Sequence, residues 1–385
     1  MTRFLTIAVA LVTVSFGYDT VPNPSKKKGA GALFRIHRGK LWGFMDRTGT
    51  VVIEPRFTGA GDFFEGLASV SVGSEGDRKS CFIDERGAIV IPCLYDSTGD
   101  FSDGLAPFHL RHVWGYLDRT GKVVIAPKFP GVGPFRDGLA AVMVWQEIPC
   151  VRQVSKARSI RTIVDEAMDR KTHCVTDEMH YGYINRKGEY AIQPQFREAK
   201  DFSEGVALVQ RESPGGGTYT FIGKDGEVAV PGEFDVGHSF SEGLAAVETG
   251  VRFELNQKVA GKVGFIDKTG KYVILPRFEM ASRFSEGLAS VCEKWQVCGY
   301  IDRLGRFVNA PIYLDAWDFS DGLARVAVKQ DDGYFYIDKT GKNVFQSDGS
   351  QWDFSDGLTI VDQGWMQVYV DHRGKVVAVY EFNPF

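Results

Sequence analysis

The chain has 385 residues, of which 44% are hydrophobic and 24% are charged, and its formal net charge is −4. These values are typical of an ordinary soluble protein. They exclude the strongly basic balance of proteins that bind nucleic acids or acidic membrane surfaces. The 44 glycines and 28 phenylalanines favour an all-β chain with short strands, tight turns and aromatic anchors.

Residues 1–17 have the pattern of a secretory signal peptide. Arg3 supplies a positive start, an apolar stretch runs from Phe4 to Phe16, and the small residues Ser15 and Gly17 favour cleavage after Gly17. The stretch is too short for a membrane-spanning helix, so we expect no integral membrane segment after cleavage. A buried first strand or an uncleaved anchor is the alternative. Residues 18–30 are polar and indicate a flexible linker.

One short phrase recurs along the rest of the chain. It reads Phe-x-(Asp/Glu)-Gly-(Leu/Val), as in "FSDGL" from Phe101 to Leu105. The acid and the glycine predict a bend, because glycine adopts the positive φ that tight turns need. The phenylalanine is expected to pack inward. Eight copies align, with their glycines at Gly66, Gly104, Gly138, Gly205, Gly243, Gly287, Gly322 and Gly357.

A second phrase alternates with the first and predicts a hairpin. In "WGYLDRTGKVVI", from Trp114 to Ile125, β-branched and aromatic residues flank an Asp-x-x-Gly turn. An alternating run such as Leu139 to Val144 predicts a further strand before it. Nine copies begin at Trp42, Cys81, Trp114, Tyr181, Tyr219, Val263, Cys298, Tyr334 and Val368.

The link between successive hairpins indicates separate sheets. Residues 126–138 are far more than a hairpin needs, and the link carries Phe129 and Phe135, which we expect to wedge between neighbouring sheets. The predicted fold is therefore all-β: about nine antiparallel units of three to four strands, stacked like the blades of a propeller. An open β-solenoid or superhelix is the alternative. The array covers residues 31–385, with units starting near residues 31, 66, 104, 138, 205, 243, 287, 322 and 357.

At these residues the chain resembles the WG-repeat proteins, a family that is widespread in bacteria. The resemblance covers roughly residues 31–381, and the Trp-Gly pair itself stands at Trp42-Gly43 and Trp114-Gly115. In other units a different residue precedes the glycine, and that residue serves the same position in the strand. The resemblance implies a binding scaffold and no particular reaction. Residues expected to hold the repeat together include Trp42, Trp114, Phe101, Gly104, Phe202, Gly205, Phe319 and Gly322.

The six cysteines fall in local pairs. The repeat pattern favours the bridges Cys81–Cys93, Cys292–Cys298 and Cys150–Cys174, in keeping with an oxidising compartment. Six free thiols are the alternative.

Residues 146–180 interrupt the repeat in the fourth unit. A helix is expected over residues 155–171, because apolar residues recur there at helical spacing after the N-cap candidate Ser155. As the least repetitive segment, this insertion is the first candidate for a partner site, and a tolerated surface insertion is the alternative. The partner-binding candidates are Arg158, Arg161, Asp165 and Glu166.

No catalytic constellation stands out. The repeated acids are expected to serve turns, and a ligand-binding ring of carboxylates is the alternative. Four tryptophans in turns and links are expected to pack between blades, and stacking on a sugar or peptide is the alternative: Trp145, Trp295, Trp317 and Trp352. "HCVTDEMH", from His173 to His180, matches no zinc spacing, so no metal or other cofactor is expected.

The predicted function is an exported, non-enzymatic scaffold that binds a protein or a cell-envelope component and no nucleic acid. The location is secreted, periplasmic or at the cell envelope. The alternative is a carbohydrate-active or hydrolytic enzyme on a propeller-like fold, which needs unlike residues to converge in one cleft.

Overall fold

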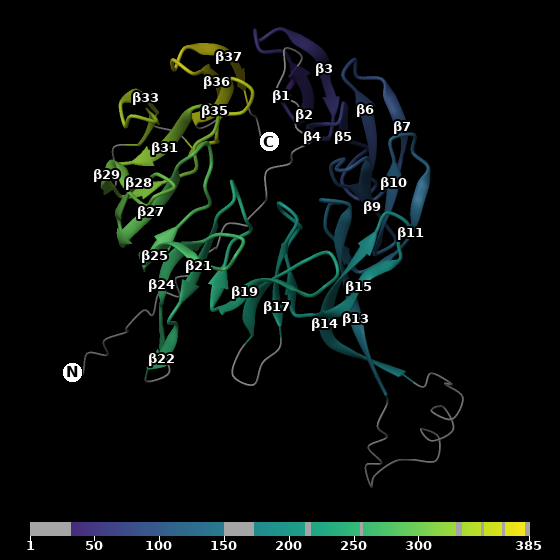
Figure 1. The fold of residues 1–385 in the computed structure, drawn as a ribbon. Coiled ribbons are helices and arrows are strands. Elements are labelled where there is room, and N and C mark those ends of the chain that lie inside the picture. Colours follow the sequence, from purple (N-terminus) through teal and green to yellow (C-terminus); the bar gives the residue numbers. More distant parts are fainter. Residues whose placement is uncertain are drawn as a thin grey trace, which may run out of the picture.

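The computed structural model describes residues 32–149, 173–211, 217–254, 257–328, 333–347, 350–363 and 366–381. These residues form nine small antiparallel sheets, called blades 1 to 9 in chain order, around a central opening (Figure 1). Blade 1 has three strands, each other blade has four, and a two-stranded hairpin is added to blade 6. The prediction of an all-β, propeller-like array is confirmed.

The strands run through each blade in chain order. Blades 1 to 3 comprise β1 Phe34–Arg38, β2 Leu41–Met45, β3 Val51–Phe57, β4 Gly59–Phe64, β5 Leu67–Val72, β6 Lys79–Asp84, β7 Ile89–Tyr95, β8 Ser97–Thr98, β9 Leu105–Leu110, β10 Val113–Asp118 and β11 Val123–Phe129. Blades 4 to 6 comprise β12 Gly131–Val132, β13 Leu139–Pro149, β14 His173–Asn185, β15 Tyr190–Phe196, β16 Glu198–Ala199, β17 Ala207–Arg211, β18 Thr218–Ile222, β19 Val228–Phe234, β20 Val236–Gly237, β21 Ala245–Thr249, the added hairpin β22 Arg252–Glu254 and β23 Gln257–Val259, β24 Lys262–Ile266 and β25 Tyr272–Phe278. Blades 7 to 9 comprise β26 Met280–Ala281, β27 Ala289–Lys294, β28 Val297–Ile301, β29 Phe307–Tyr313, β30 Asp315–Ala316, β31 Leu323–Ala327, β32 Tyr334–Asp338, β33 Asn343–Ser347, β34 Ser350–Gln351, β35 Leu358–Gln363, β36 Met366–Asp371 and β37 Val376–Glu381.

In each four-stranded blade the strands lie side by side from the axis outward. The last strand, such as β7, β11 or β29, lies on the outside of the ring (Figure 1). The first strand lies nearest the axis, comes from the link between units and has only two residues in blades 3 to 9. The outer strand is the open edge of each blade, and in blades 1, 3, 4, 6 and 7 it contains a proline, which cannot donate a backbone hydrogen bond.

Neighbouring blades are joined by aromatic side chains of the links. Phe129 and Phe135 are both buried, in one cluster with Tyr116 of blade 3 and Ala140 of blade 4. The Phe135 and Tyr116 rings meet edge to face, with centroids 4.8 Å apart. The prediction that these phenylalanines wedge between sheets is confirmed. Since a single small sheet buries too little apolar surface to be stable, each blade depends on its neighbours.

The glycine of the Trp-Gly pair is required by a close backbone approach. A Cβ on Gly264 would lie 2.6 Å from the carbonyl oxygen of Ile274 and 2.7 Å from the nitrogen of Pro276. The reason is a bulge in the outer strand. Phe265 pairs with Ile274 but Val263 pairs with Phe278, so the outer strand carries two extra residues opposite Gly264. The same glycine and proline recur in blades 1, 3, 4 and 7.

Three blades show what replaces the glycine and proline. In blade 2, Cys81 and Cys93 occupy the two positions and form a disulfide with Cα atoms 4.1 Å apart. In blade 8, Phe335 stands at the glycine position, and it pairs with Gln346 in a ladder without the bulge at that point. In blade 9, Val368 likewise pairs directly with Val379. In these three blades, a side chain at this position goes with a regular outer strand or with a covalent bond across the approach.

The ring is closed by contact between blade 9 and blade 1. Ile36 and Met45 of blade 1 form one buried cluster with Leu358 and Tyr369 of blade 9. The Tyr369 hydroxyl donates to the Arg35 carbonyl oxygen across this seam. The stack is thus a closed propeller and not the open spiral that the sequence also allowed.

The prediction of one helical insertion is wrong for the part that the structure describes. The strands β13 and β14 continue into residues 146–149 and 173–180 as an antiparallel ribbon, in which Ile148 pairs with Cys174. The ladder continues because the two flanking segments leave the blade side by side. The helix expected over residues 155–171 lies outside the described residues. Among the described residues, no helix has the length and apolar character to cross a membrane.

Candidate functional site

The recurring Phe-x-acid-Gly-Leu phrase is a two-residue turn between the inner strand and the next strand. In blade 3, Asp103 and Gly104 have φ values of 50° and 73°. Ser102 and Leu105 exchange both backbone hydrogen bonds around them, with N···O distances of 2.9 and 3.2 Å. Positive φ at both central residues defines a type I′ turn, so the predicted bend is confirmed.

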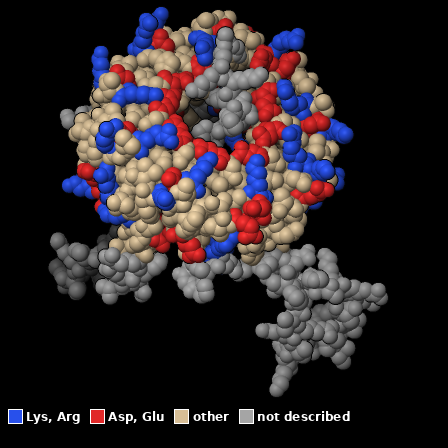
Figure 2. All heavy atoms as spheres, in the orientation of Figure 1, with Lys and Arg blue, Asp and Glu red and all other residues tan. Residues whose placement is uncertain are grey.

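The repeated acids join one blade to the next. Seven of the eight carboxylates accept a hydrogen bond from the repeat glycine of the following blade, as from Gly322 N–H to Glu286 Oε2 at 3.0 Å. The same bond joins Glu65 to Gly104, Asp103 to Gly138, Asp137 to Gly205, Glu204 to Gly243, Glu242 to Gly287 and Asp321 to Gly357. Figure 2 shows acidic side chains gathered around the central opening. The interpretation of these acids as structural therefore fits better than a ligand-binding ring.

Basic side chains of the hairpin turns reinforce this contact. Lys339 Nζ lies 3.2 Å from Glu286 Oε2 in the preceding blade, and Lys268 Nζ lies 3.2 Å from Glu204 Oε2. At the seam, Arg47 of blade 1 pairs with Asp356 of blade 9 at 3.9 Å. These turns all lie at one end of the strands, which we call the turn face. Its contacts are nearly the same in successive blades.

The opposite end of the strands, which we call the loop face, varies from blade to blade. It carries the connection between the second and third strand of each four-stranded blade, from two residues in blade 3 to the long ribbon of β13 and β14. The longest connections belong to blades 4 and 6, where β14 and β22 project on the same side of the ring (Figure 1). Variable loops on a rigid ring are the usual place for binding residues.

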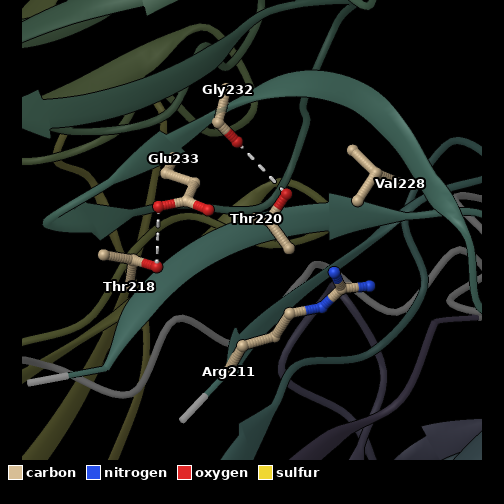
Figure 3. Close-up of a pocket in the computed structure, with 6 residues that line it drawn as sticks. All are labelled: Arg211, Thr218, Thr220, Val228, Gly232 and Glu233. Atoms are coloured by element: carbon tan, nitrogen blue, oxygen red, sulfur yellow. Dashed lines mark hydrogen bonds between the residues drawn. The ribbon is translucent and has the colours of Figure 1, made fainter. Parts of the chain in front are cut away.

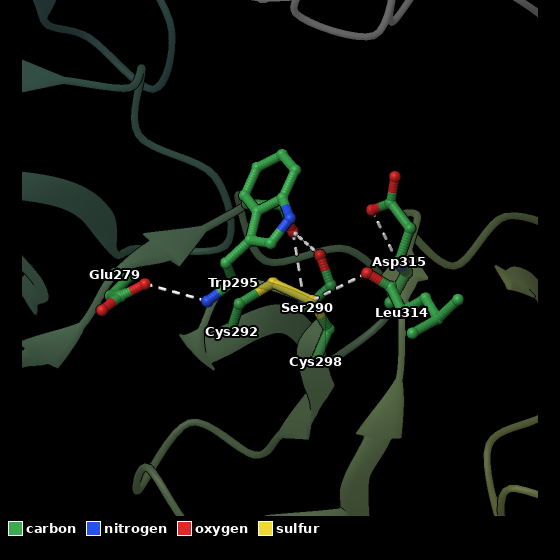
Figure 4. The surroundings of a disulfide bond; sticks show 9 residues. Glu279, Ser290, Cys292, Trp295, Cys298, Leu314 and Asp315 are labelled. Carbon is green, nitrogen blue, oxygen red and sulfur yellow. Dashed lines mark hydrogen bonds between the residues drawn. A yellow bond between two sulfur atoms is a disulfide. The ribbon is translucent and has the colours of Figure 1, made fainter. Parts of the chain in front are cut away.

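One loop of this face displays a tryptophan on a rigid support. The turn between β27 and β28 is closed by the disulfide Cys292–Cys298, with Cα atoms 4.0 Å apart. Glu279 Oε2 accepts the backbone N–H of Trp295 at 2.9 Å (Figure 4). The Trp295 side chain is nevertheless 70% exposed. An ordered backbone that presents an exposed indole ring is suited to contact with another molecule, because the loop loses little conformational entropy on binding.

The expectation that four tryptophans pack between blades is wrong for three of them, and the ring contact of the fourth, Trp317, is not one between blades. Trp145 and Trp352 are 46% and 57% exposed, and Trp295 is more exposed still. Trp317 does pack, but within its own blade: the Arg325 guanidinium lies 4.0 Å from the centroid of its ring. The sequence assigns all four to turns or links, whereas Trp145 lies in β13 and pairs with Met179.

A shallow pocket opens at the loop-face end of blade 5. Six residues line it: Arg211, Thr218, Thr220, Val228, Gly232 and Glu233 (Figure 3). The Thr220 hydroxyl donates to the Gly232 carbonyl oxygen at 3.2 Å, and the Thr218 hydroxyl donates to Glu233 Oε2 at 3.3 Å. None of these residues was among the sequence candidates.

Near the axis, burial changes the chemistry of one carboxyl group. Asp201 precedes Phe202 on the inner strand side of blade 5, and burial raises the pKa of its carboxyl to about 6, against the opposing effect of Arg136 and Lys200. The ionised form is therefore disfavoured in the folded state. The stability contributed by this group is complete below about pH 4 and is lost as the pH rises through 6.

We expect the change in unfolding free energy caused by Asp201→Asn, relative to wild type, to be more stabilising at pH 7.5 than at pH 4.5. One pKa unit corresponds to about 1.4 kcal/mol, so the pH-dependent gain is no more than about 3 kcal/mol. Urea unfolding of wild type and variant at both pH values measures it. Asp267→Asn is the control that should show almost no change between the two pH values, since a hydrogen bond from Thr269 lowers the pKa of Asp267 and its carboxyl is ionised in both the folded and the unfolded state over this range. A difference between wild type and D201N that does not change with pH contradicts the assignment.

The remaining sequence candidates fall into three groups. Phe101, Phe202 and Phe319 are buried at blade junctions. The predicted bridges Cys81–Cys93 and Cys292–Cys298 are confirmed. Cys150 lies outside the described residues, so the bridge Cys150–Cys174 stays a prediction. The partner-binding candidates Arg158, Arg161, Asp165 and Glu166 also lie outside the described residues. In the described part of the chain, no three His, Cys, Asp or Glu side chains are placed to hold a metal ion.

Comparisons with solved structures give matches at low sequence identity, and the first of those below supports the fold alone. A eukaryotic initiation factor is similar with 12% identity and a TM-score of 0.52, over 82% of this chain and 85% of that one. Porphyromonas gingivalis dipeptidyl peptidase 4 matches with 8% identity and a TM-score of 0.42, over 93% and 60%. The Neurospora crassa Pan2 WD40 domain matches with 12% identity and a TM-score of 0.31, over 88% and 87%. A search of curated proteins finds no match.

The sequence itself matches a family model seven times. The model describes the WG containing repeat, and it covers more than half of the chain, at residues 42–74, 82–108, 114–144, 181–213, 219–250, 264–294 and 299–332. These segments coincide with the hairpins and turns described above. The chain therefore belongs to the WG-repeat family.

Proposed function

We propose that this protein is an exported, non-enzymatic scaffold that binds another protein or a cell-envelope component through its loop face. The observation that carries the proposal is the contrast between the two faces. The turn face repeats the same inter-blade contacts, whereas the loop face varies in length and chemistry from blade to blade and displays Trp295 on a disulfide-closed turn. The pattern of residues 1–17 and the two disulfides support export, because disulfides persist in oxidising compartments.

Affinity capture from cell-envelope extracts tests the proposal. Residues 18–385 are immobilised, and the captured proteins are quantified by mass spectrometry. We expect Trp295→Ala to reduce capture of the specific partner about tenfold, as is typical of an exposed aromatic anchor. The shortened ribbon, with residues 150–172 replaced by a two-residue turn, tests whether the same partner also uses blade 4.

The control is an exposed apolar side chain on the other face. Leu304 lies in a turn of the turn face and is 68% exposed. Leu304→Ala should leave capture unchanged. Partners that are lost with Leu304→Ala but retained by both loop-face variants would place binding on the wrong face and contradict the proposal.

A further inference from the structure

Blade 5 departs from the repeat at two positions that face each other. Thr220 stands where other blades have the glycine of the Trp-Gly pair, and Gly232 stands where they have the proline of the outer strand. In blade 1 the corresponding Gly43 and Pro55 approach closely, since a Cβ on Gly43 would lie 2.6 Å from the Pro55 nitrogen. In blade 5 the proline ring is missing, and the Thr220 hydroxyl holds the Gly232 carbonyl oxygen instead. The pocket opens at this exchange.

A third difference concerns a charged residue at the end of the neighbouring strand, which is β1 in blade 1 and β17 in blade 5. Arg38 of blade 1 and Arg211 of blade 5 occupy the same position, the last residue of β1 and of β17. Arg38 Nη1 lies 3.3 Å from Glu54 Oε2 on the outer strand. The residue of blade 5 that corresponds to Glu54 is Pro231. Arg211 therefore lacks the carboxylate that pairs with its counterpart, and its guanidinium lines the pocket.

The other side of the pocket offers a hydrogen-bond acceptor. Glu233 Oε2 accepts the Thr218 hydroxyl, which leaves Oε1 facing the pocket region, and Figure 3 shows Thr220 between Glu233 and Arg211. The pocket has a volume of about 200 Å³. Sites for drug-sized ligands have roughly 300–1,000 Å³, so this one suits a single side chain of a larger partner.

We propose that the blade 5 pocket binds a glutamate or aspartate side chain of an acidic peptide segment. The ligand carboxylate pairs with the Arg211 guanidinium, and a backbone N–H of the same segment donates to Glu233. Arginine is suited to this role because its planar group binds a carboxylate through two parallel hydrogen bonds. The inference rests on the proposed function, since it assigns a chemistry to the partner of the loop face.

NMR titration of the full-length mature protein tests the site with a defined probe. Acetyl-Gly-Glu-Gly-amide is added, and the backbone amide resonances of Thr218, Thr220 and Gly232 are followed. We expect saturable shifts at these residues. The uncharged probe acetyl-Gly-Gln-Gly-amide should bind about tenfold more weakly, because the charge-assisted contact to arginine is lost. Equal binding of the two probes overturns the proposal.

Two arginine variants separate the pocket from general charge effects. Arg211→Gln should weaken binding of the glutamate probe about tenfold. Arg38→Gln removes the same charge from the corresponding position in blade 1 and should leave binding unchanged. Wild-type affinity in R211Q, or equal loss in both variants, overturns the proposal. The comparison of the two probes on the wild-type protein still decides the matter if R211Q fails to fold.

The result can be told apart from a failure of the proposed function. If the probe does not bind while envelope capture depends on Trp295, only the pocket assignment is wrong. If the probe binds through Arg211 while no partner is captured, the carboxylate site stands and the scaffold function is wrong.

Discussion

Replacement of Gly264 by alanine is expected to lower the free energy of unfolding by about 3 kcal/mol. The added Cβ would meet the Ile274 carbonyl oxygen at 2.6 Å and the Pro276 nitrogen at 2.7 Å. Both are backbone atoms, so they cannot turn aside as the end of a flexible side chain does. The outer strand would have to move away from Phe265, which is fully buried beside Ile274 in the same cluster. Urea unfolding of the full chain measures the loss.

Gly39 provides the control for this substitution. It has a φ of 61° in the turn between β1 and β2, and a Cβ there would meet no atom within 4 Å. Gly39→Ala should therefore lose only about 1 kcal/mol, from the strain of a left-handed backbone. Equal losses in the two variants would show that lost backbone freedom, and not the close approach, explains the glycine.

A double substitution should restore the unfolding free energy that Gly264→Ala loses. Gly264→Cys with Pro276→Cys places cysteines at the positions that Cys81 and Cys93 occupy in blade 2. We expect a disulfide to form between them under oxidising conditions, and we expect reduction to lower the unfolding midpoint. Thiol titration of the unfolded protein distinguishes the bridged from the free form.

Much of the fold could be predicted because the repeat supplies many copies of one pattern. The Asp-x-x-Gly turns and the phenylalanines of the links are strong local signals, and both were interpreted correctly. The inner strands were missed: a strand of two residues, such as Gly131–Val132, is too short to show alternation. Closure was left open because it depends on the angle between successive blades, which no residue pattern specifies. The seam through Tyr369 joins residues 334 positions apart.

The candidate site was harder to predict than the fold. The long insertion is the most conspicuous interruption of the repeat, whereas the pocket arises from substitutions at the regular repeat positions Thr220 and Gly232. A signal was present: four of the nine units depart from the glycine and proline, and in blade 5 the glycine position carries a threonine while the proline position carries a glycine. Its meaning needed the register of β18 with β19, which brings the two positions together. The exposure of Trp295 also required the structure, because no residue pattern predicts that the ring of this turn residue stays 70% exposed.

Removal of the Phe284 ring should cause a comparable or larger loss than the glycine substitution. Phe284 is fully buried between blades 6 and 7, and its ring centroid lies 5.0 Å from that of Phe265. Phe284→Ala is expected to lower the free energy of unfolding by about 3–5 kcal/mol, because a large cavity would open in a rigid junction. Urea unfolding measures it, and hydrogen exchange should show the loss of protection first in β24 and β27.

The repeat offers a matched control for that junction. Tyr300 occupies in blade 7 the position that Phe265 occupies in blade 6, and its hydroxyl donates to the Trp317 carbonyl oxygen of the next blade at 2.7 Å. In Phe265→Tyr the new hydroxyl would meet the corresponding carbonyl of Ser282, so stability should change by less than about 1 kcal/mol. If Phe284→Ala costs as little as Phe265→Tyr, the ring does not depend on aromatic contacts between blades. The inter-blade hydrogen bonds of the turn face would then have to hold it together.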